Sequence, residues 1–222
     1  MNDDIKPLRA SMVTRAAKKF KRKMYSREES GRPKNIPFNL FDNEPNFLED
    51  EIKNVKAYAE YGVGASTKYV LKFSDAKISC MDSDPYWMEK ACADFMGSPR
   101  LTTKVVDLGD VLSWGIPVGS GKAENFHRYV NWFYEEGDAP ELLLIDGRFR
   151  VCCFLTALQN MSGGGKIIFD DYVFRPQYHF VENFLKPHQT KGRQALFKVP
   201  EAKRWNREHL DLAIEAFRFN LN

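Results

Sequence analysis

Acidic residues stand at or beside the ends of five consecutive predicted β-strands, where each could bind a ligand or accept a proton. They are Glu60, Asp82, Asp107, Asp146 and the pair Asp170 and Asp171. In open α/β sheets, ligands bind outside the carboxyl ends of the strands. One solvated carboxylate at a strand end is common, but five such ends in a row indicate a single ligand-binding edge.

The elements that would position these acids alternate along the chain from about residue 44. The predicted strands are 55–62, 77–82, 102–108, 141–146, 166–171, 195–199 and 216–221. The predicted helices are 46–54, 66–74, 85–96, 125–136, 150–161 and 178–185. Repeated βα units are typical of a parallel sheet with helices on both faces, so we expect one α/β domain over residues 38–222. The glycine-rich segment 109–124 is expected to form a loop.

The composition excludes several classes of protein. Apolar residues make up 43% of the 222 residues and charged residues 28%, which excludes disorder over the whole length. No apolar run approaches the roughly 20 residues of a membrane span, and the start of the chain lacks the apolar core of a secretory signal. Four cysteines without a CxxC pair are too few for a disulfide scaffold, so we expect reduced core residues in a cytoplasmic protein.

The positive charge is concentrated in a basic N-terminal arm, residues 1–37. Residues 1–35 hold 11 Lys and Arg against 4 Asp and Glu, whereas the remainder holds 22 against 26. Apolar residues recur every four positions from Leu8 to Met24, which predicts a basic amphipathic helix. Such a helix could contact nucleic acid or an anionic membrane, or it could pack on the body or stay solvated. A mildly acidic body argues against a nucleic-acid-binding protein.

The turn after the first strand, Glu60 to Thr67, differs from a dinucleotide fingerprint. Thr67 occupies the position of the third glycine in GxGxxG. Glu60 would repel a pyrophosphate but would attract a cationic amino group. Ser66, Thr67 and the first N–H groups of the following helix could hold a carboxylate. Asp82, 18 residues after Gly64, is suitably placed to accept hydrogen bonds from ribose hydroxyls.

This ordered set of residues resembles class I S-adenosylmethionine-dependent methyltransferases over about residues 44–200. The resemblance is based on E-x-G-x-G-x-S-T after the first strand, the acids after the second and third, and ELLLID at the fourth. It implies a Rossmann-like, three-layer domain with a mostly parallel seven-stranded sheet and an antiparallel last strand, for which 195–199 and 216–221 would supply the hairpin. It also implies S-adenosylmethionine as cofactor. The implied cofactor-binding residues are Glu60, Gly62, Gly64, Ser66, Thr67, Asp82, Ser83, Asp107 and Asp146.

Two further segments, LLLIDGRFR and GGGKIIFDDYVFRP, are similar to parts of small-molecule O-methyltransferases. The resemblance implies that Asp146, Asp170 and Asp171 could bind Mg²⁺ or another divalent cation, which would lower the pKa of a substrate hydroxyl. Arg148 and Arg150 depart from the metal-dependent pattern, because they add positive charge at the same place. They could instead bind a carboxylate or phosphate of the substrate.

An oxygen nucleophile needs a base to remove its proton, and the candidates are Asp146, Asp171 and His179. The predicted function is therefore methyl transfer to a small, polar or anionic molecule. The absence of an NPPY-like tetrapeptide favours oxygen as the atom that accepts the methyl group. Two alternatives stay open. One is a non-catalytic interaction module with this fold, and the other is a nucleotide-dependent oxidoreductase or sugar-nucleotide enzyme on a similar sheet.

Overall fold

The computed structural model describes residues 39–112, 115–136, 139–203 and 205–220. The chain divides into two units, residues 1–35 and 36–222. The predicted basic arm, residues 1–37, lies outside the described residues, so the arm and its boundary stay predictions. The strands and helices of the described structure all belong to the second unit.

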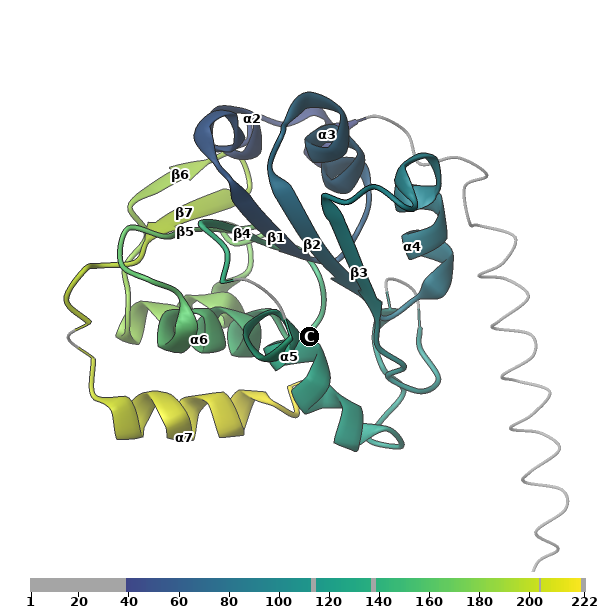
Figure 1. Cartoon of the computed structure of the whole chain (residues 1–222). Coiled ribbons are helices and arrows are strands. Elements are labelled where there is room, and N and C mark those ends of the chain that lie inside the picture. Colours follow the sequence, from purple (N-terminus) through teal and green to yellow (C-terminus); the bar gives the residue numbers. More distant parts are fainter. Residues whose placement is uncertain (1–38, 113–114, 137–138, 204, 221–222) are drawn as a thin grey trace, which may run out of the picture. The chain divides into compact units, whose positions relative to one another are not determined.

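Within the described ranges, one seven-stranded sheet has the order β3-β2-β1-β4-β5-β7-β6 (Figure 1). The first five strands run parallel, whereas β7 runs antiparallel to both β5 and β6. The order changes direction between β1 and β4, which is where α/β sheets bind ligands. The strands are β1 (Ala57–Tyr61), β2 (Lys77–Asp82), β3 (Leu101–Val105), β4 (Leu142–Ile145), β5 (Lys166–Phe169), β6 (Gln189–Lys191) and β7 (Gln194–Lys198).

Helices cover both faces of the sheet, with α5, α6 and α7 on one face and α2, α3 and α4 on the other (Figure 1). The α-helices are α2 (Leu48–Glu51), α3 (Ala65–Phe73), α4 (Pro85–Cys92), α5 (Phe126–Glu135), α6 (Arg150–Asn160) and α7 (Arg207–Phe217). The 3₁₀ segments are η1 (Leu40–Asn43), η2 (Ile52–Asn54), η3 (Ala93–Phe95), η5 (Ala123–Asn125) and η6 (Pro176–Asn183). No helix in the described part of the chain has the length and apolar character needed to cross a membrane.

The central strand β4 explains why both faces must be covered. All four of its residues, Leu142 to Ile145, are fully buried. A strand that is apolar on both faces is stable only between two layers of helices. The side chains of this strand therefore contribute to both hydrophobic clusters of the core. The predicted three-layer α/β architecture with an antiparallel last strand is confirmed.

Four predicted elements differ from the structure. The predicted strand 216–221 is wrong, because helix α7 extends to Phe217. Asn206 caps this helix by accepting a hydrogen bond from the backbone N–H of His209 at 3.0 Å. The hairpin partner of β7 is instead the short, polar strand β6, which lacks an apolar pattern. The predicted helix 178–185 is the 3₁₀ segment η6. The predicted helix 46–54 is divided into α2 and η2, and the predicted helix 85–96 is divided into α4 and η3.

Candidate cofactor and acceptor site

A cleft of about 650 Å³ lies at the carboxyl ends of β1, β2, β4 and β5. The segments at residues 39–42 and 115–116 and the buried helix residue Tyr129 complete its walls. The predicted site residues that line it are Gly62, Gly64, Ser66, Asp82, Ser83, Asp146, Arg148, Arg150 and Asp171. The predicted site residues outside its lining are Glu60, Thr67, Asp107, Asp170 and His179. The structure thus brings most of the predicted site residues into one cleft at the topological switch point.

Two glycines meet at the floor of the cleft. Gly62 has a φ of +87°, and a Cβ atom built on it would lie 2.8 Å from the backbone nitrogen of Gly147. A Cβ on Gly147 would lie 2.9 Å from the backbone nitrogen of Gly62 and would overlap the hydroxyl of Tyr129. The turns after β1 and β4 can therefore approach this closely only because both residues lack side chains. The result is a floor of bare backbone on which a ligand can lie.

The first turn of α3 forms the wall beside this floor. The backbone N–H of Gly64 donates a hydrogen bond to Oγ1 of Thr67 at 2.9 Å, which fixes the start of the helix. Thr67 is fully buried by this role, whereas Ala65 and Ser66 line the cleft. The first N–H groups of a helix lack partners within the helix, and the helix dipole there favours negative charge. This wall therefore suits a carboxylate or another anionic group.

Glu60 lies on β1 beneath the glycine turn and is fully buried. Its Oε2 accepts a hydrogen bond from the hydroxyl of Tyr58 at 2.8 Å, whereas Oε1 has no hydrogen-bond partner in the described structure. Burial raises the pKa of Glu60 to about 7, although the nearby hydroxyls of Thr67, Tyr58 and Ser66 oppose the shift. The predicted binding of a cationic amino group by Glu60 stays a prediction.

Asp82 ends β2 and holds two neighbouring turns. Its Oδ2 accepts a hydrogen bond from the N–H of Val63 at 2.9 Å, and its Oδ1 accepts one from the N–H of Asp84 at 2.8 Å. Burial raises the pKa of Asp82 to about 6, while these backbone donors oppose the shift. Each oxygen keeps a second lone pair, so the carboxylate can also accept hydrogen bonds from ligand hydroxyls.

Asp107 and His179 lie away from the cleft lining. The Asp107 side chain is 66% exposed, and it accepts a hydrogen bond from the N–H of Gly109 and pairs with Lys122 at 3.7 Å. Nε2 of His179 lies 3.0 Å from the backbone oxygen of Tyr172, and its ring packs on the Tyr172 ring. The predicted roles of Asp107 beside adenine and of His179 as a base stay predictions.

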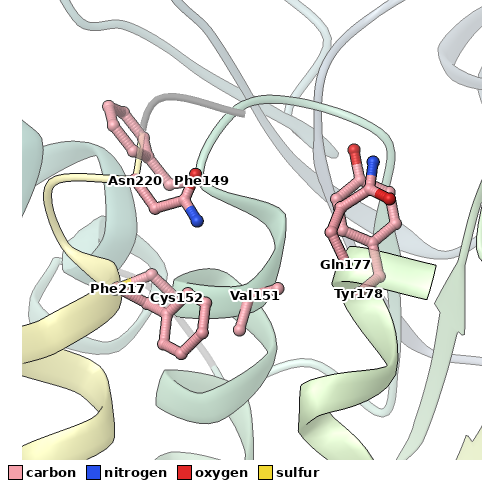
Figure 2. Close-up of a pocket in the computed structure, with 7 residues that line it drawn as sticks. All are labelled: Phe149, Val151, Cys152, Gln177, Tyr178, Phe217 and Asn220. Atoms are coloured by element: carbon pink, nitrogen blue, oxygen red, sulfur yellow. The ribbon is translucent and has the colours of Figure 1, made fainter. Parts of the chain in front are cut away.

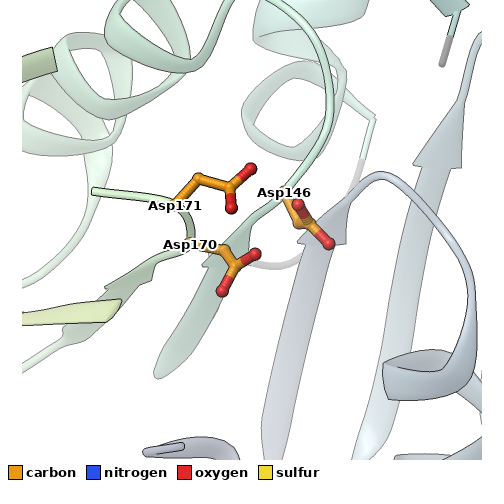
Figure 3. A group of neighbouring side chains, drawn as sticks. All are labelled: Asp146, Asp170 and Asp171. Atoms are coloured by element: carbon orange, nitrogen blue, oxygen red, sulfur yellow. The ribbon is translucent and has the colours of Figure 1, made fainter. Parts of the chain in front are cut away.

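Three carboxylates gather where β4 and β5 end (Figure 3). One oxygen of each lies within 4.8 Å of the others, in the residues Asp146, Asp170 and Asp171. Asp170 is fully buried, whereas Asp146 and Asp171 reach the cleft. Carboxylates this close repel one another, so they need compensating positive charge.

Arginine side chains supply that positive charge. Nη2 of Arg150 lies 2.9 Å from Asp146, and Nη2 of Arg193 lies 2.9 Å from Asp170. Asp171 pairs with Arg175 at 2.8 Å and with Arg150 at 3.3 Å. Arg193 and Arg175 are not among the site residues predicted from the sequence.

These ion pairs test whether the cluster fits a metal ion. A divalent cation would need an oxygen of each of Asp146, Asp170 and Asp171 to face a common position that no other cation occupies. Each of those carboxylates instead has a guanidinium group within 3 Å. The arrangement of these side chains does not fit a metal ion, and we derive no step through one.

Arg148 and Arg150 have different surroundings, although the sequence assigns them one role. Arg150 donates hydrogen bonds to the backbone oxygens of Gly147, Asp170 and Asp146 at 3.0, 2.8 and 3.0 Å. The donors of Arg150 are therefore largely used within the protein. Nε of Arg148 is buried without a hydrogen-bond partner in the described structure.

A second hollow lies behind the turn after β4, and it measures only about 10 Å³ (Figure 2). Its walls are Phe149, Val151, Cys152, Gln177, Tyr178, Phe217 and Asn220. This volume is close to the least that holds one water molecule. The larger cleft is therefore the candidate ligand site.

Comparison with known proteins shows which solved structures resemble this fold. No protein-family model matches the chain, and no curated protein sequence matches it either. The crystal structure of a methyltransferase-like protein from Silicibacter pomeroyi is similar, with a TM-score of 0.66 and 28% sequence identity. The match covers 78% of this chain and 92% of that protein.

Two further solved structures have lower similarity. The N-methyltransferase NodS from Bradyrhizobium japonicum, in complex with S-adenosyl-L-homocysteine, has a TM-score of 0.46 and 12% identity over 70% of this chain and 83% of that one. Fibrillarin from Aeropyrum pernix, with natively bound S-adenosyl-L-methionine, has a TM-score of 0.45 and 10% identity over 66% of each chain. Both TM-scores are below 0.5, so we derive nothing from them. The strand order, the glycine turn and the likeness to the Silicibacter protein show that this chain has the fold of class I S-adenosylmethionine-dependent methyltransferases.

Proposed function

We propose that this protein transfers the methyl group of S-adenosylmethionine to an oxygen atom of a small molecule. The observation that supports this function best is the cleft at the switch point. Its glycine floor, the start of α3 and Asp82 offer three different kinds of contact within about 650 Å³. The cofactor needs all three, because it combines an amino acid with a ribose.

The chain's own residues fit that cofactor on one side of the cleft. Ser66 and the first N–H groups of α3 would hold its carboxylate, and Oε1 of Glu60 would accept a hydrogen bond from its amino group. Asp82 would accept hydrogen bonds from its ribose, with Ser83 beside it. When bound, S-adenosylmethionine supplies a methyl group that its positive sulfur already activates.

The other side of the cleft would deprotonate and orient the acceptor. Burial and the neighbouring carboxylate of Asp170 raise the pKa of Asp146, while Arg150 opposes the shift. A base with a pKa nearer to neutrality is better matched to a hydroxyl proton at physiological pH. Asp146 would therefore take the acceptor's proton, and Asp171 is the next candidate along the same wall.

The charges of the cleft favour a small acceptor over a nucleic acid. The basic residues in its lining are Arg148, Arg150, Arg175 and Arg193, and the acidic ones are Asp42, Asp82, Asp146 and Asp171. The two signs balance, and most of these charges form ion pairs within the protein. A nucleic-acid groove needs a surplus of positive charge to contact phosphates.

Calorimetric titration with S-adenosylmethionine and S-adenosylhomocysteine tests the cofactor, with NAD and a sugar nucleotide as comparison ligands. We expect micromolar binding of the two adenosyl ligands alone. Asp82→Asn should weaken it by about 10-fold or more, since a ribose contact is lost. Glu89→Gln, a matched change at an exposed carboxylate on α4, should leave it unaltered. No adenosyl binding to the folded protein would overturn the proposed function.

Mass spectrometry of a hydroxylated small-molecule panel then tests the transfer itself. A product heavier by one methylene group, with S-adenosylhomocysteine formed in equal amount, supports methylation at oxygen. Methylation of amines but not of hydroxyls would overturn the choice of oxygen. Adenosyl binding without any product over the panel would favour the non-catalytic module.

A further inference from the structure

Arg148 differs from the other three arginines that line the cleft. Arg150, Arg175 and Arg193 each pair with a carboxylate at 2.9 Å or less. Arg148 forms no ion pair with any residue in the described part of the chain, and its Nε is buried without a hydrogen-bond partner. Only 8% of the residue is exposed, although it lines the cleft. Its guanidinium group is therefore a buried cation without a counter-ion.

Hydrogen bonds to both the backbone N–H and the backbone oxygen of Arg148 hold this residue in place. The backbone N–H of Arg148 donates a hydrogen bond to the Tyr129 hydroxyl at 3.1 Å. Its backbone oxygen accepts one from Sγ of Cys153 at 3.4 Å. Gly147, just before it, has no room for a side chain. The position is therefore built rather than incidental, because helices α5 and α6 both fix the turn that presents Arg148.

An unpaired buried cation is unfavourable unless a ligand pairs with it. Burial and the nearby Arg150 lower the pKa of Arg148, whereas Asp146 opposes the shift. A guanidinium group nevertheless stays charged, because its ordinary pKa is far above neutrality. The free protein thus keeps a positive group in the cleft that an anion would stabilise.

The surroundings of Arg148 place it on the acceptor side. Arg148 follows Asp146 and Gly147 in the turn after β4, and its backbone is held by Tyr129 of α5 and Cys153 of α6. The carboxylate of the cofactor would bind at the start of α3, which is a different segment of the cleft lining. Asp146, the proposed base, is two residues before Arg148 and lines the same cleft. An anion at Arg148 would therefore lie beside the proton that Asp146 removes.

We propose that Arg148 binds an oxyanion, a carboxylate or a phosphate, on the methyl acceptor, whose hydroxyl group lies at Asp146. The substrate class is then a small hydroxylated acid. A guanidinium group suits this role, because its parallel N–H donors match the two oxygens of a carboxylate or phosphate. The assignment to the acceptor rests on the proposed function, whereas the anion site itself can be tested alone.

The test follows arginine Nε–Hε signals by NMR while sodium formate or inorganic phosphate is added at constant ionic strength. Both ions are small enough for the cleft, and formamide serves as the uncharged match for formate. The signal absent from the Arg148→Gln spectrum identifies Arg148. We expect saturable, millimolar binding of formate or phosphate at that signal and none of formamide. Tighter binding of formate would indicate a carboxylate on the acceptor, and tighter binding of phosphate would indicate a phosphate.

Two variants complete the design, and each titration is run without and with saturating S-adenosylhomocysteine. Arg128→Gln should retain anion binding at the Arg148 signal in full. Arg128 is exposed, precedes Tyr129 and lies outside the cleft lining. Arg128→Gln therefore removes one positive charge, as Arg148→Gln does, without altering the cleft. Arg148→Gln should bind S-adenosylhomocysteine as the unaltered protein does.

Each outcome separates the anion site from the proposed function. The anion site is overturned if neither ion shifts the Arg148 signal saturably, or if formamide shifts it in the same way. Loss of S-adenosylhomocysteine binding in Arg148→Gln, with anion binding absent from the cofactor-saturated protein, overturns the acceptor assignment, because Arg148 would then hold the cofactor. Failure of S-adenosylhomocysteine to bind any variant overturns the proposed function, while anion binding at Arg148 would still stand.

Discussion

Arg150, the first residue of α6, and Asp146 form an ion pair across the turn between β4 and α6, with Nη2 of the arginine 2.9 Å from Oδ1 of the aspartate. The Arg150 side chain is only 5% exposed, and the same guanidinium group also binds the backbone oxygen of Asp170. The ends of β4 and β5 are thus joined by one cation. Arg150 therefore positions the proposed base, and it is not free to bind the substrate.

Replacement of Arg150 should destabilise the protein strongly. Removal of one partner from a buried ion pair leaves an uncompensated charge, which typically costs about 3–5 kcal/mol. We expect Arg150→Gln to lower the free energy of unfolding by about 3 kcal/mol in urea denaturation. Arg128→Gln, which removes an exposed charge, should change it by less than about 0.5 kcal/mol. Equal effects of the two changes would contradict the structural role of Arg150.

The two glycines of the turn after β1 should respond differently to alanine. In Gly62→Ala, the new Cβ would lie 2.8 Å from the backbone of Gly147, at a φ of +87°. We expect a loss of about 2 kcal/mol or more in the free energy of unfolding. In Gly64→Ala, the Cβ meets nothing within 4 Å and φ is extended at 179°, so we expect a change below about 1 kcal/mol. Similar losses for both variants would contradict the close approach at Gly62.

Glu60 should make the free protein less stable as the pH rises. Its pKa is about 7 in the folded state, against an ordinary value of 4.5. Between these values the folded state binds more protons than the unfolded state, so the free energy of unfolding falls as the pH rises through this window. For Glu60 alone, the fall would be at most about 3 kcal/mol between pH 4.5 and 7.

Glu60→Gln tests this dependence, because glutamine keeps an acceptor for the Tyr58 hydroxyl but does not titrate. Urea denaturation at pH 5 and pH 8 should show a smaller loss of stability in the variant than in the unaltered protein. Asp82 and Asp146 also have raised pKa values and contribute in the same direction in both proteins. An unchanged pH dependence in Glu60→Gln would show that Glu60 does not titrate in this range.

The rate of methyl transfer should depend on the protonation of Asp146. The base must be ionised to accept a proton, and the pKa of Asp146 is raised by burial and by Asp170. We therefore expect kcat to fall on the acid side with an apparent pKa above the ordinary aspartate range. Asp146→Asn should lower kcat by about 100-fold or more and abolish this acid limb. Retention of the limb in the variant would assign it to another group, with Asp171 first to be tested.

Removal of divalent cations should leave the methyl transfer unchanged. Guanidinium groups already compensate Asp146, Asp170 and Asp171, so no cation is needed to hold the carboxylates together. We expect the rate in EDTA to lie within about 2-fold of the rate in added Mg²⁺. A catalytic metal stabilises the transition state by several kcal/mol, so its removal would lower the rate far more than that. A loss of about 100-fold in EDTA, restored by Mg²⁺, would contradict this expectation and support the metal site that the sequence predicts.

The central strands and the glycine turn could be predicted from the sequence, because their cause is local. Residues 142–145 are apolar on both faces, and Gly62 stands where a turn must form. The end of the chain was harder to predict. Residues 216–221 alternate apolar and polar residues as a strand does, but the cap at Asn206 starts a helix that extends into this segment.

The charge compensation of the site could not be predicted from spacing. Arg193 binds Asp42 at 2.7 Å and Asp170 at 2.9 Å, and 151 residues separate Arg193 from the first of these. No pattern within a segment reveals such a pair. The same reason explains why the sequence predicts three metal ligands where the structure has three ion-paired carboxylates. Arg148 and Arg150 also look equivalent in sequence, and only the fold separates them.

The buried carboxylate of Asp170 couples the end of β5 to the start of β7. Its side-chain partners in the described structure are Arg193 and Gln194, which lie at the start of β7. An ionised carboxylate cannot leave water alone without a large penalty. Asp170 can therefore be buried only where β7 is docked against β5. The end of β5 beside the cleft thus depends on the hairpin that follows it in the chain.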